Sequence, residues 1–354
     1  MTRTAWFATL SLSLIVASTA YSSFPTAEKT KVIIVADVGV DDAAGLFWAL
    51  DDYDDYSLDV MGVAASFGSH PDPAVTANNA RRVLDAAGRS DVPVYVGSRW
   101  PLGTTEPHAD EVTRKFMGTD GLGGSRGCAA DQPESTMSAA EFIVTSARAH
   151  PGEITLLSFS PLTDVALASL LEPRLPSLLR RVVAMGGAID APGNVTPLAE
   201  ANFNHDARAA RIVVKSFGGI SPGKLVLVPL DVTEKAIITE EDVRHAPEIF
   251  TAAFVTFRGA YCELLGACEG APVHDAHVVA YLTNPELYET KTVAIDVVVG
   301  PGDDTNGMVV VDRRSWAETI APRVTVLTNV DTEGFREQLA FRFRKNAMRY
   351  FTKY

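Results

Sequence analysis

Residues 35–45 read VADVGVDDAAG, and they end a short apolar run with three aspartates, Asp37, Asp41 and Asp42. The run KVIIVAD is short and β-branched, which is typical of a buried strand, and DAAGLFWALDD is typical of a helix. Carboxylates repel one another and cost free energy to bury. Capping of the helix would explain one of them. A hard cation such as calcium, with about six to eight oxygen ligands, would explain all three.

The alternation of strand and helix continues along the chain. Paired segments follow in LDVMGVAAS and PAVTANNARRVLDAAG, EITLLSFS and LTDVALASLL, RVVAMGG and DARAARIVVKSF, and KLVLVPLDV and EEDVRHAPEIFTAAFVTF. This pattern predicts an α/β fold, a single domain over residues 31–354 with a largely parallel (mixed) central sheet and helices on both faces. The aspartates would then lie at the carboxyl end of a strand, where such sheets bind ligands.

Two segments near the ends of this pattern carry further expectations. Residues 103–134 lack periodicity, and we expect a long loop there. The final stretch, EGFREQLAFRFRKNAMRYF, predicts an amphipathic helix that packs one face on the domain and leaves the other in solvent.

Length, composition and charge exclude some classes of protein. The 354 residues are 47% apolar, which suffices for a large core, and the formal net charge is −13. Nucleic-acid-binding proteins usually carry a basic surface, so we expect no nucleic-acid partner.

The N-terminus predicts export. Arg3 precedes AWFATLSLSLIVASTA, an apolar stretch that ends in small residues. This is the layout of a signal peptide over residues 1–22, cleaved near Ala20 or Ser22, although an uncleaved membrane anchor is the alternative. Nothing else in the sequence suggests membrane insertion. We therefore expect a secreted or otherwise exported protein, in an extracellular, periplasmic or endomembrane space.

The three cysteines are too few for a disulfide scaffold. Export makes a bridge between Cys262 and Cys268 possible, and unpaired thiols are equally compatible with the sequence. Cys128 has no obvious partner.

Several motifs together resemble one family. ADVGVDDAAG resembles the DxDPGxDDA signature of the inosine–uridine-preferring nucleoside hydrolases. Further blocks match in the family's order: ITLLSFSPLTDVALA, VVAMGGAIDAPGNVTPLAEANFNHDARAARIV, LVPLDVTEKAIIT, GAPVHDAHVVAYLTNPELY and TNGMVVVDRR. The resemblance runs from about Lys31 to Arg314. It implies a Rossmann-like core, an enzyme that cleaves ribonucleosides to a free base and ribose, and a homo-oligomer, either a dimer or a tetramer.

The resemblance also implies a calcium site. The family's ligands match Asp37, Asp42, Asp275 and the backbone carbonyl of Thr163. Asp42, Asp275 and Thr163 have structural alternatives, as does Asp41, because the three aspartates can begin or cap helices and Thr163 can be an N-cap.

Sugar and base contacts carry over in the same way. Asp41 matches the carboxylate that grips the ribose 2′-hydroxyl, and Asn194, Glu200 and Asn202 match ribose-binding residues. His274 matches a histidine proposed to protonate the leaving base. N-glycosidic cleavage passes through an oxocarbenium-like state and needs an activated water. Asp37 would take the proton of that water, and His274 or a bound water would protonate the base.

Some positions depart from the family pattern. Val35 and Val38 replace an aspartate and a proline of the signature, Ser69 replaces an asparagine, and Ala201 replaces a phenylalanine. The loop KFMGTDGLGG lacks a histidine that many members carry. These changes keep open a catalytically weak nucleoside- or sugar-binding relative that acts as a sensor, and an enzyme for another riboside.

The remaining polar residues carry weaker expectations. His70, His108, His205 and His277 receive no role and are expected at the surface or behind the site. Asn194 begins an N-x-[ST] glycosylation motif, and a glycan there would block the pocket. Either Asn194 is buried before it can be modified or the host does not glycosylate exported proteins, and we favour a buried Asn194.

Overall fold

The computed structural model describes residues 29–51, 58–106, 111–125, 135–300, 303–316 and 322–352. The predicted signal peptide, Cys128 and His108 lie outside the described residues. Within these ranges, every helix is too short or too polar to cross a bilayer.

A nine-stranded sheet forms the centre of the described structure, in the order β10-β9-β11-β6-β5-β4-β1-β2-β3. All neighbouring pairs from β11 to β3 are parallel, and β9 runs antiparallel to both β11 and β10. The strands are β1 Thr30–Ala36, β2 Leu58–Ala65, β3 Val94–Val96, β4 Thr155–Ser158, β5 Arg181–Met185, β6 Leu225–Val228, β9 Tyr288–Val297, β10 Val309–Val311 and β11 Arg323–Val330. A separate antiparallel pair joins β7 (Ile237–Ile238) to β8 (Ala271–Pro272).

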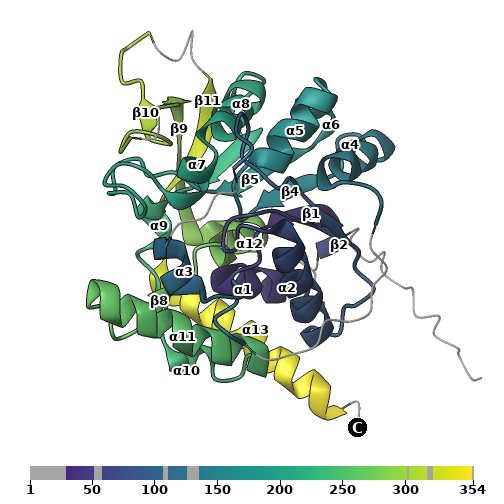
Figure 1. Ribbon diagram of the computed structural model, residues 1–354, viewed down its shortest axis with the longest axis vertical. Helices are drawn as coiled ribbons and strands as arrows, with labels where there is room; N and C mark the ends of the chain where they lie inside the picture. Colours follow the sequence, from purple (N-terminus) through teal and green to yellow (C-terminus); the bar gives the residue numbers. More distant parts are fainter. Residues whose placement is uncertain are drawn as a thin grey trace, which may run out of the picture.

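Helices cover both faces of the sheet, as Figure 1 shows. Alternate side chains of β1 point to opposite faces, so Val32, Ile34 and Ala36 join one hydrophobic cluster and Ile33 and Val35 join another. The first cluster packs under α1 (Val40–Ala49), α2 (Pro73–Ala86), α11 (Glu248–Leu265), α12 (Ala276–Thr283) and α13 (Thr332–Thr352). The second packs under α4 (Ala139–Ala149), α5 (Thr163–Leu171) and α8 (Ala207–Gly218). The predicted α/β architecture is confirmed.

Short elements complete the chain: α3 Glu111–Met117, α6 Leu175–Leu178, α7 Ala201–His205, α9 Leu230–Thr233, α10 Glu240–Val243 and the 3-10 turn Pro285–Leu287. The expectation of an unstructured loop over residues 103–134 is wrong at α3. This helix has no buried residue and packs on α11 through Phe116, whose ring lies 4.8 Å from that of Tyr261. A helix of seven residues with a single contact face shows too few apolar repeats to be predicted from the sequence.

The strand order indicates where on the sheet a ligand is expected to bind. The chain passes from β1 outward to β2 and β3, and then returns to add β4 on the other side of β1. Such a reversal leaves a crevice at the carboxyl ends of the two strands beside it. The residues after β1 and β4 therefore lie at the position where open α/β sheets bind ligands.

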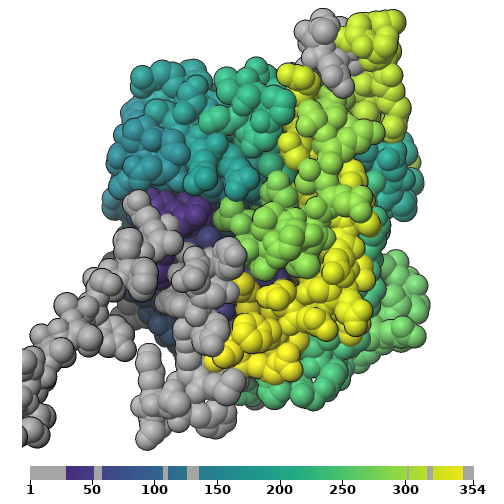
Figure 2. All heavy atoms as spheres, turned by 180° about the vertical axis from the view of Figure 1, so that it is seen from behind, coloured from purple at the N-terminus to yellow at the C-terminus, as the bar shows by residue number. Residues whose placement is uncertain are grey.

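The C-terminal helix α13 packs as predicted. It buries Phe335, Leu339 and Phe343, which are spaced at one face, and it runs across the surface in Figure 2. The Phe343 ring lies 5.3 Å from Phe250 of α11 and 6.4 Å from Phe47 of α1. This aromatic cluster joins α13 to the two helices that border the site.

The buried His277 of α12 makes stability depend on pH. Its ring stacks on Phe335 at 3.8 Å, and its Nδ1 lies 2.9 Å from the Tyr288 hydroxyl. Burial lowers its pKa to about 3. Between pH 3 and 6.5 the unfolded chain therefore binds more protons at this site than the folded chain, and stability falls as the pH falls. At pH 5 this effect amounts to about 2 kcal/mol.

We expect the His277→Phe variant, which keeps a stacked ring, to lack this pH dependence. Urea unfolding at pH 7 and pH 5 measures the stability gap between wild type and variant. The gap should shift in the variant's favour by about 2 kcal/mol at pH 5, because every other titrating group is common to both proteins. An unchanged gap would show that His277 does not resist protonation.

Candidate active site

A cavity of about 440 Å³ opens at the carboxyl ends of the central strands. Asp37 follows β1, Ser69 follows β2, Phe159 follows β4 and Met185 ends β5, and all four line the cavity. The cavity also brings together the other candidate residues: Asp41, Asp42, Asn194, Glu200, Asn202, His274 and Asp275.

Three carboxylates meet at one end of the cavity. Asp41 and Asp42 lie in the first turn of α1, and Asp275 is the N-cap of α12, which packs on α1. One oxygen from each lies within 4.8 Å of the others, and all three residues are buried. Burial and mutual repulsion raise the pKa of Asp42 and Asp275 well above the ordinary value.

This group fits a hard cation. Asp41 Oδ1 and Asp275 Oδ1 are buried and have no hydrogen-bond partner among the described residues. A buried acceptor left without a donor costs free energy, and a cation among the three carboxylates would remove both this cost and the repulsion. With no cysteine or histidine in the group, its donors suit calcium or magnesium better than zinc.

Asp42 also caps the first turn of α1, as its structural alternative predicts. Its Oδ1 accepts from the Asp37 N–H at 3.1 Å, and its Oδ2 accepts from the Gly39 N–H at 2.9 Å. These bonds fix the carboxylate while it lines the cavity.

Asp37 is held at the end of β1 by the segment that follows β2. The Ser69 N–H donates to Asp37 Oδ2, and the Ser69 hydroxyl donates to the Asp37 carbonyl. A Cβ at Gly68 would lie 2.0 Å from Asp37 Oδ2, so only glycine fits there. Burial raises the pKa of Asp37 to about 8, against the lowering effect of the Ser69 N–H. The deprotonated form of a carboxyl group with a raised pKa is a stronger base than an ordinary aspartate.

Glu200 and Asn202 are positioned by the backbone around α7. The Glu200 carboxylate accepts from the N–H groups of Asn202, Gly187 and Phe203 at 2.8, 2.9 and 3.1 Å. Burial raises its pKa to about 7. The Asn202 amide donates to the Phe159 carbonyl at 3.0 Å. Both polar groups therefore have fixed directions at the cavity wall.

Asn194 lies at the cavity but is exposed, so the expectation that it is buried is wrong. It belongs to the irregular segment between β5 and α7, and its side-chain oxygen accepts from the Ala201 N–H at 2.9 Å.

Thr163 has a different position from the other predicted ligands. It begins α5, is buried, and donates its hydroxyl to Asp206 at 2.7 Å. It is not among the described residues that line the cavity. Asp37 lines the cavity but is not part of the three-carboxylate group. The roles of Asp37 and the Thr163 carbonyl as ligands stay predictions.

His274 lies between two hydroxyl groups. Its Nδ1 is 2.7 Å from the Thr233 hydroxyl, and its Nε2 is 3.2 Å from the Tyr261 hydroxyl. Burial lowers the pKa of His274, and the Asp41 carboxylate acts in the opposite direction. Burial also raises the pKa of Tyr261, so its hydroxyl keeps its proton at neutral pH. Thr233 and Tyr261 were not predicted from the sequence, although Thr233 ends the VPLDVT block.

Aromatic residues form one wall of the same cavity. Phe116 of α3 and Phe257 and Tyr261 of α11 line it, with ring centroids 4.8 to 6.3 Å apart. Met117 lines the cavity at the end of α3. His205 also lines it, and both His205 and His277 are buried, so of the two expected positions, at the surface or behind the site, the surface is excluded for them. Flat apolar surfaces of this kind suit a stacked heterocyclic base.

The sequence profile described as "Inosine-uridine preferring nucleoside hydrolase" matches residues 32–337. The chain belongs to this family. The resemblance carried by the motifs is thereby confirmed, and with it the assignment as a ribonucleoside N-glycosyl hydrolase.

Individual nucleoside hydrolases agree with this assignment. The pyrimidine-specific ribonucleoside hydrolase RihA of Photobacterium profundum is 35% identical over 318 residues, covering 88% of this chain and 97% of the relative. A plant nucleoside hydrolase structure has a TM-score of 0.80 at 27% identity and covers 90% of this chain and 99% of its own. The purine-preferring ribonucleoside hydrolase of Gardnerella vaginalis has the same fold, with a TM-score of 0.82 at 24% identity over the same shares of both chains. Because these names differ in the base, the shared fold does not determine base preference.

Proposed function

We propose that this nucleoside hydrolase is exported, depends on calcium, and releases a free base and ribose from ribonucleosides. The observation that carries calcium dependence is the group of Asp41, Asp42 and Asp275, with two buried oxygens that lack a donor among the described residues. Calcium tolerates irregular all-oxygen coordination, whereas magnesium demands near-octahedral geometry.

The side chains that bind the sugar are held in fixed orientations by hydrogen bonds to the backbone. Glu200 accepts three backbone N–H bonds and Asn202 is tied to the Phe159 carbonyl, so both meet the ribose hydroxyls without losing side-chain freedom on binding. Asn194 adds a contact from the cavity mouth, and Asp41 binds the 2′-hydroxyl. In this orientation the anomeric carbon faces Asp37 on one side, and the base points toward the aromatic wall.

Proton transfers begin and end the reaction. When bound, calcium supplies charge that orients the sugar diol and lowers the pKa of a nearby water. Asp37 takes the proton of the attacking water, and the surrounding carboxylates favour the cationic sugar. His274, between Thr233 and Tyr261, gives a proton to the departing base. Because burial favours neutral His274, Asp41 is the group that helps it to hold that proton.

Two features support export. Residues 1–22 have the composition of a signal peptide. The structure also joins Cys262 to Cys268 in a disulfide, and such bonds persist in oxidising compartments. A homo-oligomer of two or four chains stays a prediction from the resemblance. No observation on the described residues favours a binding protein without turnover.

A substrate panel tests the proposal. The chain, expressed with its own N-terminus in a secreting host, is incubated with inosine, guanosine, adenosine and uridine, with and without chelator. We expect release of ribose from at least one nucleoside, its loss on chelation, and its return on addition of calcium. Mass spectrometry of the exported protein should place its first residue just after Ala20 or Ser22. Activity that survives exhaustive chelation would refute calcium dependence.

A further inference from the structure

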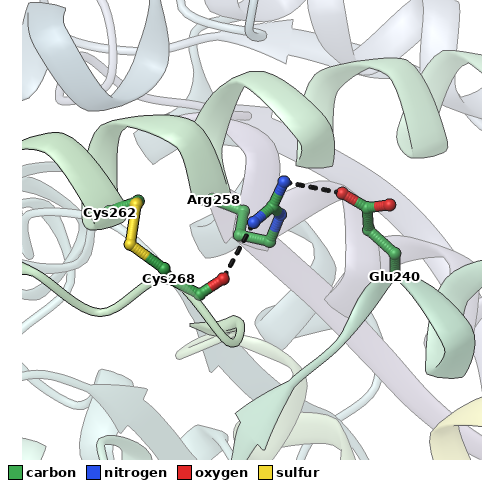
Figure 3. Close-up of a disulfide and its surroundings, with 4 residues drawn as sticks. All are labelled: Glu240, Arg258, Cys262 and Cys268. Carbon is green, nitrogen blue, oxygen red and sulfur yellow. Dashed lines mark hydrogen bonds and ion pairs between the residues drawn. A yellow bond between two sulfur atoms is a disulfide. The ribbon is translucent and has the colours of Figure 1, made fainter.

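The Cys262–Cys268 disulfide lies at the end of the helix that forms the aromatic wall (Figure 3). Helix α11 ends at Leu265, Gly266 follows in the left-handed conformation with φ +71°, and the chain turns back to Cys268. Arg258 donates from Nη1 to the Cys268 carbonyl at 2.8 Å and pairs through Nη2 with Glu240 Oε1 at 2.8 Å. The turn is therefore fixed by a covalent bond and tied to α10.

Few buried contacts anchor this end of α11. The fully buried residues of the helix are Ile249, Phe250, Ala253, Phe254 and Phe257. Beyond Phe257, Tyr261 is partly buried against the Phe116 and Phe257 rings, and Leu265 is 64% exposed. Helix ends with few buried apolar contacts open most easily, so the disulfide and Arg258 add to the ring contacts of Tyr261 in holding the last two turns. Tyr261 lies in these turns.

The same disulfide also closes the chain segment that leads from Tyr261 to His274. Cys262 directly follows Tyr261, and from Cys268 the chain enters β8 and then reaches His274. The contact between the Tyr261 hydroxyl and His274 Nε2 closes this segment at its inner end, 3.2 Å apart, while the disulfide closes it at the surface. On the opposite side, pairing of β8 with β7 and the Thr233 contact hold His274 in place. Tyr261 is the member of this set whose position depends on the cross-link.

We propose that the Cys262–Cys268 disulfide, with Arg258, positions Tyr261 against His274 and so sustains protonation of the leaving base. The inference rests on the proposed role of His274. Cys262, Cys268 and Arg258 are positioning residues, because they act through Tyr261.

Two substrates separate this role from a general structural one. A nucleoside needs a proton on its leaving base, whereas p-nitrophenyl β-ribofuranoside loses a stable phenolate without protonation. In the Cys262→Ser/Cys268→Ser variant we expect kcat for the best nucleoside to fall about tenfold, and kcat for the p-nitrophenyl riboside to stay within about twofold of wild type. Arg258→Met should show the same selective loss, to a smaller extent. Cys128→Ser, which leaves the disulfide intact, is the matched control.

Each other outcome overturns the inference. Equal losses on both substrates would make the disulfide a support of the whole site, and unchanged kcat on both would make it irrelevant to the reaction. Reduction of wild type with dithiothreitol should reproduce the selective loss, and the double variant should not respond. A wild-type chain that cleaves nucleosides, together with a disulfide variant that shows no selective loss, would refute the inference alone. A wild-type chain that cleaves no nucleoside would refute the proposed function itself.

Discussion

Replacing Asp275 by asparagine is expected to abolish cation binding and to lower kcat/KM for every nucleoside by about a thousandfold or more. That loss corresponds to about 4 kcal/mol of transition-state stabilisation. Asp275 is the one carboxylate of the group that α12 contributes, opposite Asp41 and Asp42 of α1. An amide in its place removes one negative charge and keeps only one oxygen that can bind a cation. Calorimetric titration with calcium and steady-state kinetics measure the two effects separately.

A matched aspartate tests whether the effect belongs to the site. Asp296 of β9 lies at the surface and pairs with Lys215 at 2.8 Å and Arg211 at 3.1 Å. Exposed ion pairs contribute little, so Asp296→Asn should keep calcium affinity and kcat/KM within about twofold of wild type. If Asp275→Asn bound calcium with wild-type affinity, the three carboxylates would not be the cation site.

The same variant should change stability in a direction opposite to most buried substitutions. Without a cation, the buried carboxylates repel one another, and this repulsion adds to burial in raising the pKa of Asp275. Removing one charge relieves that repulsion, so without calcium the variant should be at least as stable as wild type. With calcium, only wild type gains stability from binding. Thermal unfolding with and without chelator distinguishes this pattern from a simple packing defect.

Part of this site was readable in the sequence because its parts are local. Asp37, Asp41 and Asp42 lie within one strand-to-helix connection, and alternating apolar runs predict the strand that carries them. Asp275 and His274 required the family resemblance, since only the packing of α12 on α1 brings them to the cluster. Local periodicity carries no information on which helices pack together.

The base side of the cavity was not predictable for the same reason. Phe116 meets Tyr261 through a short helix without buried residues, in a stretch that reads as loop. The contact of Tyr261 with His274 joins two segments through a turn whose geometry depends on a disulfide that the sequence left open. The prediction that Asn194 is buried was wrong for a different reason, because a motif can indicate contact with a ligand but not burial.

Replacing His274 by alanine is expected to lower kcat for nucleosides by about a hundredfold to ten-thousandfold, the usual contribution of a positioned proton donor. The p-nitrophenyl riboside should be cleaved within a few-fold of the wild-type rate, because its leaving group needs no proton. Thr233 and Tyr261 place the imidazole at 2.7 and 3.2 Å, so its loss leaves no donor in the same position. Steady-state kinetics on both substrates measures the selectivity, and His150→Ala, a partly exposed histidine at the end of α4, is the control.

The pattern of losses decides the role of His274. Equal losses on both substrates would mean that His274 shapes the sugar or cation site, and no loss on either would transfer proton donation to Tyr261 or to a water. The disulfide variant gives a further check, because groups that act in one chain of contacts are not additive. If the disulfide acts only through Tyr261 and His274, removing it in the His274→Ala background should cause no further fall in nucleoside turnover. An additional tenfold fall there would show that the cross-link supports the site by another route.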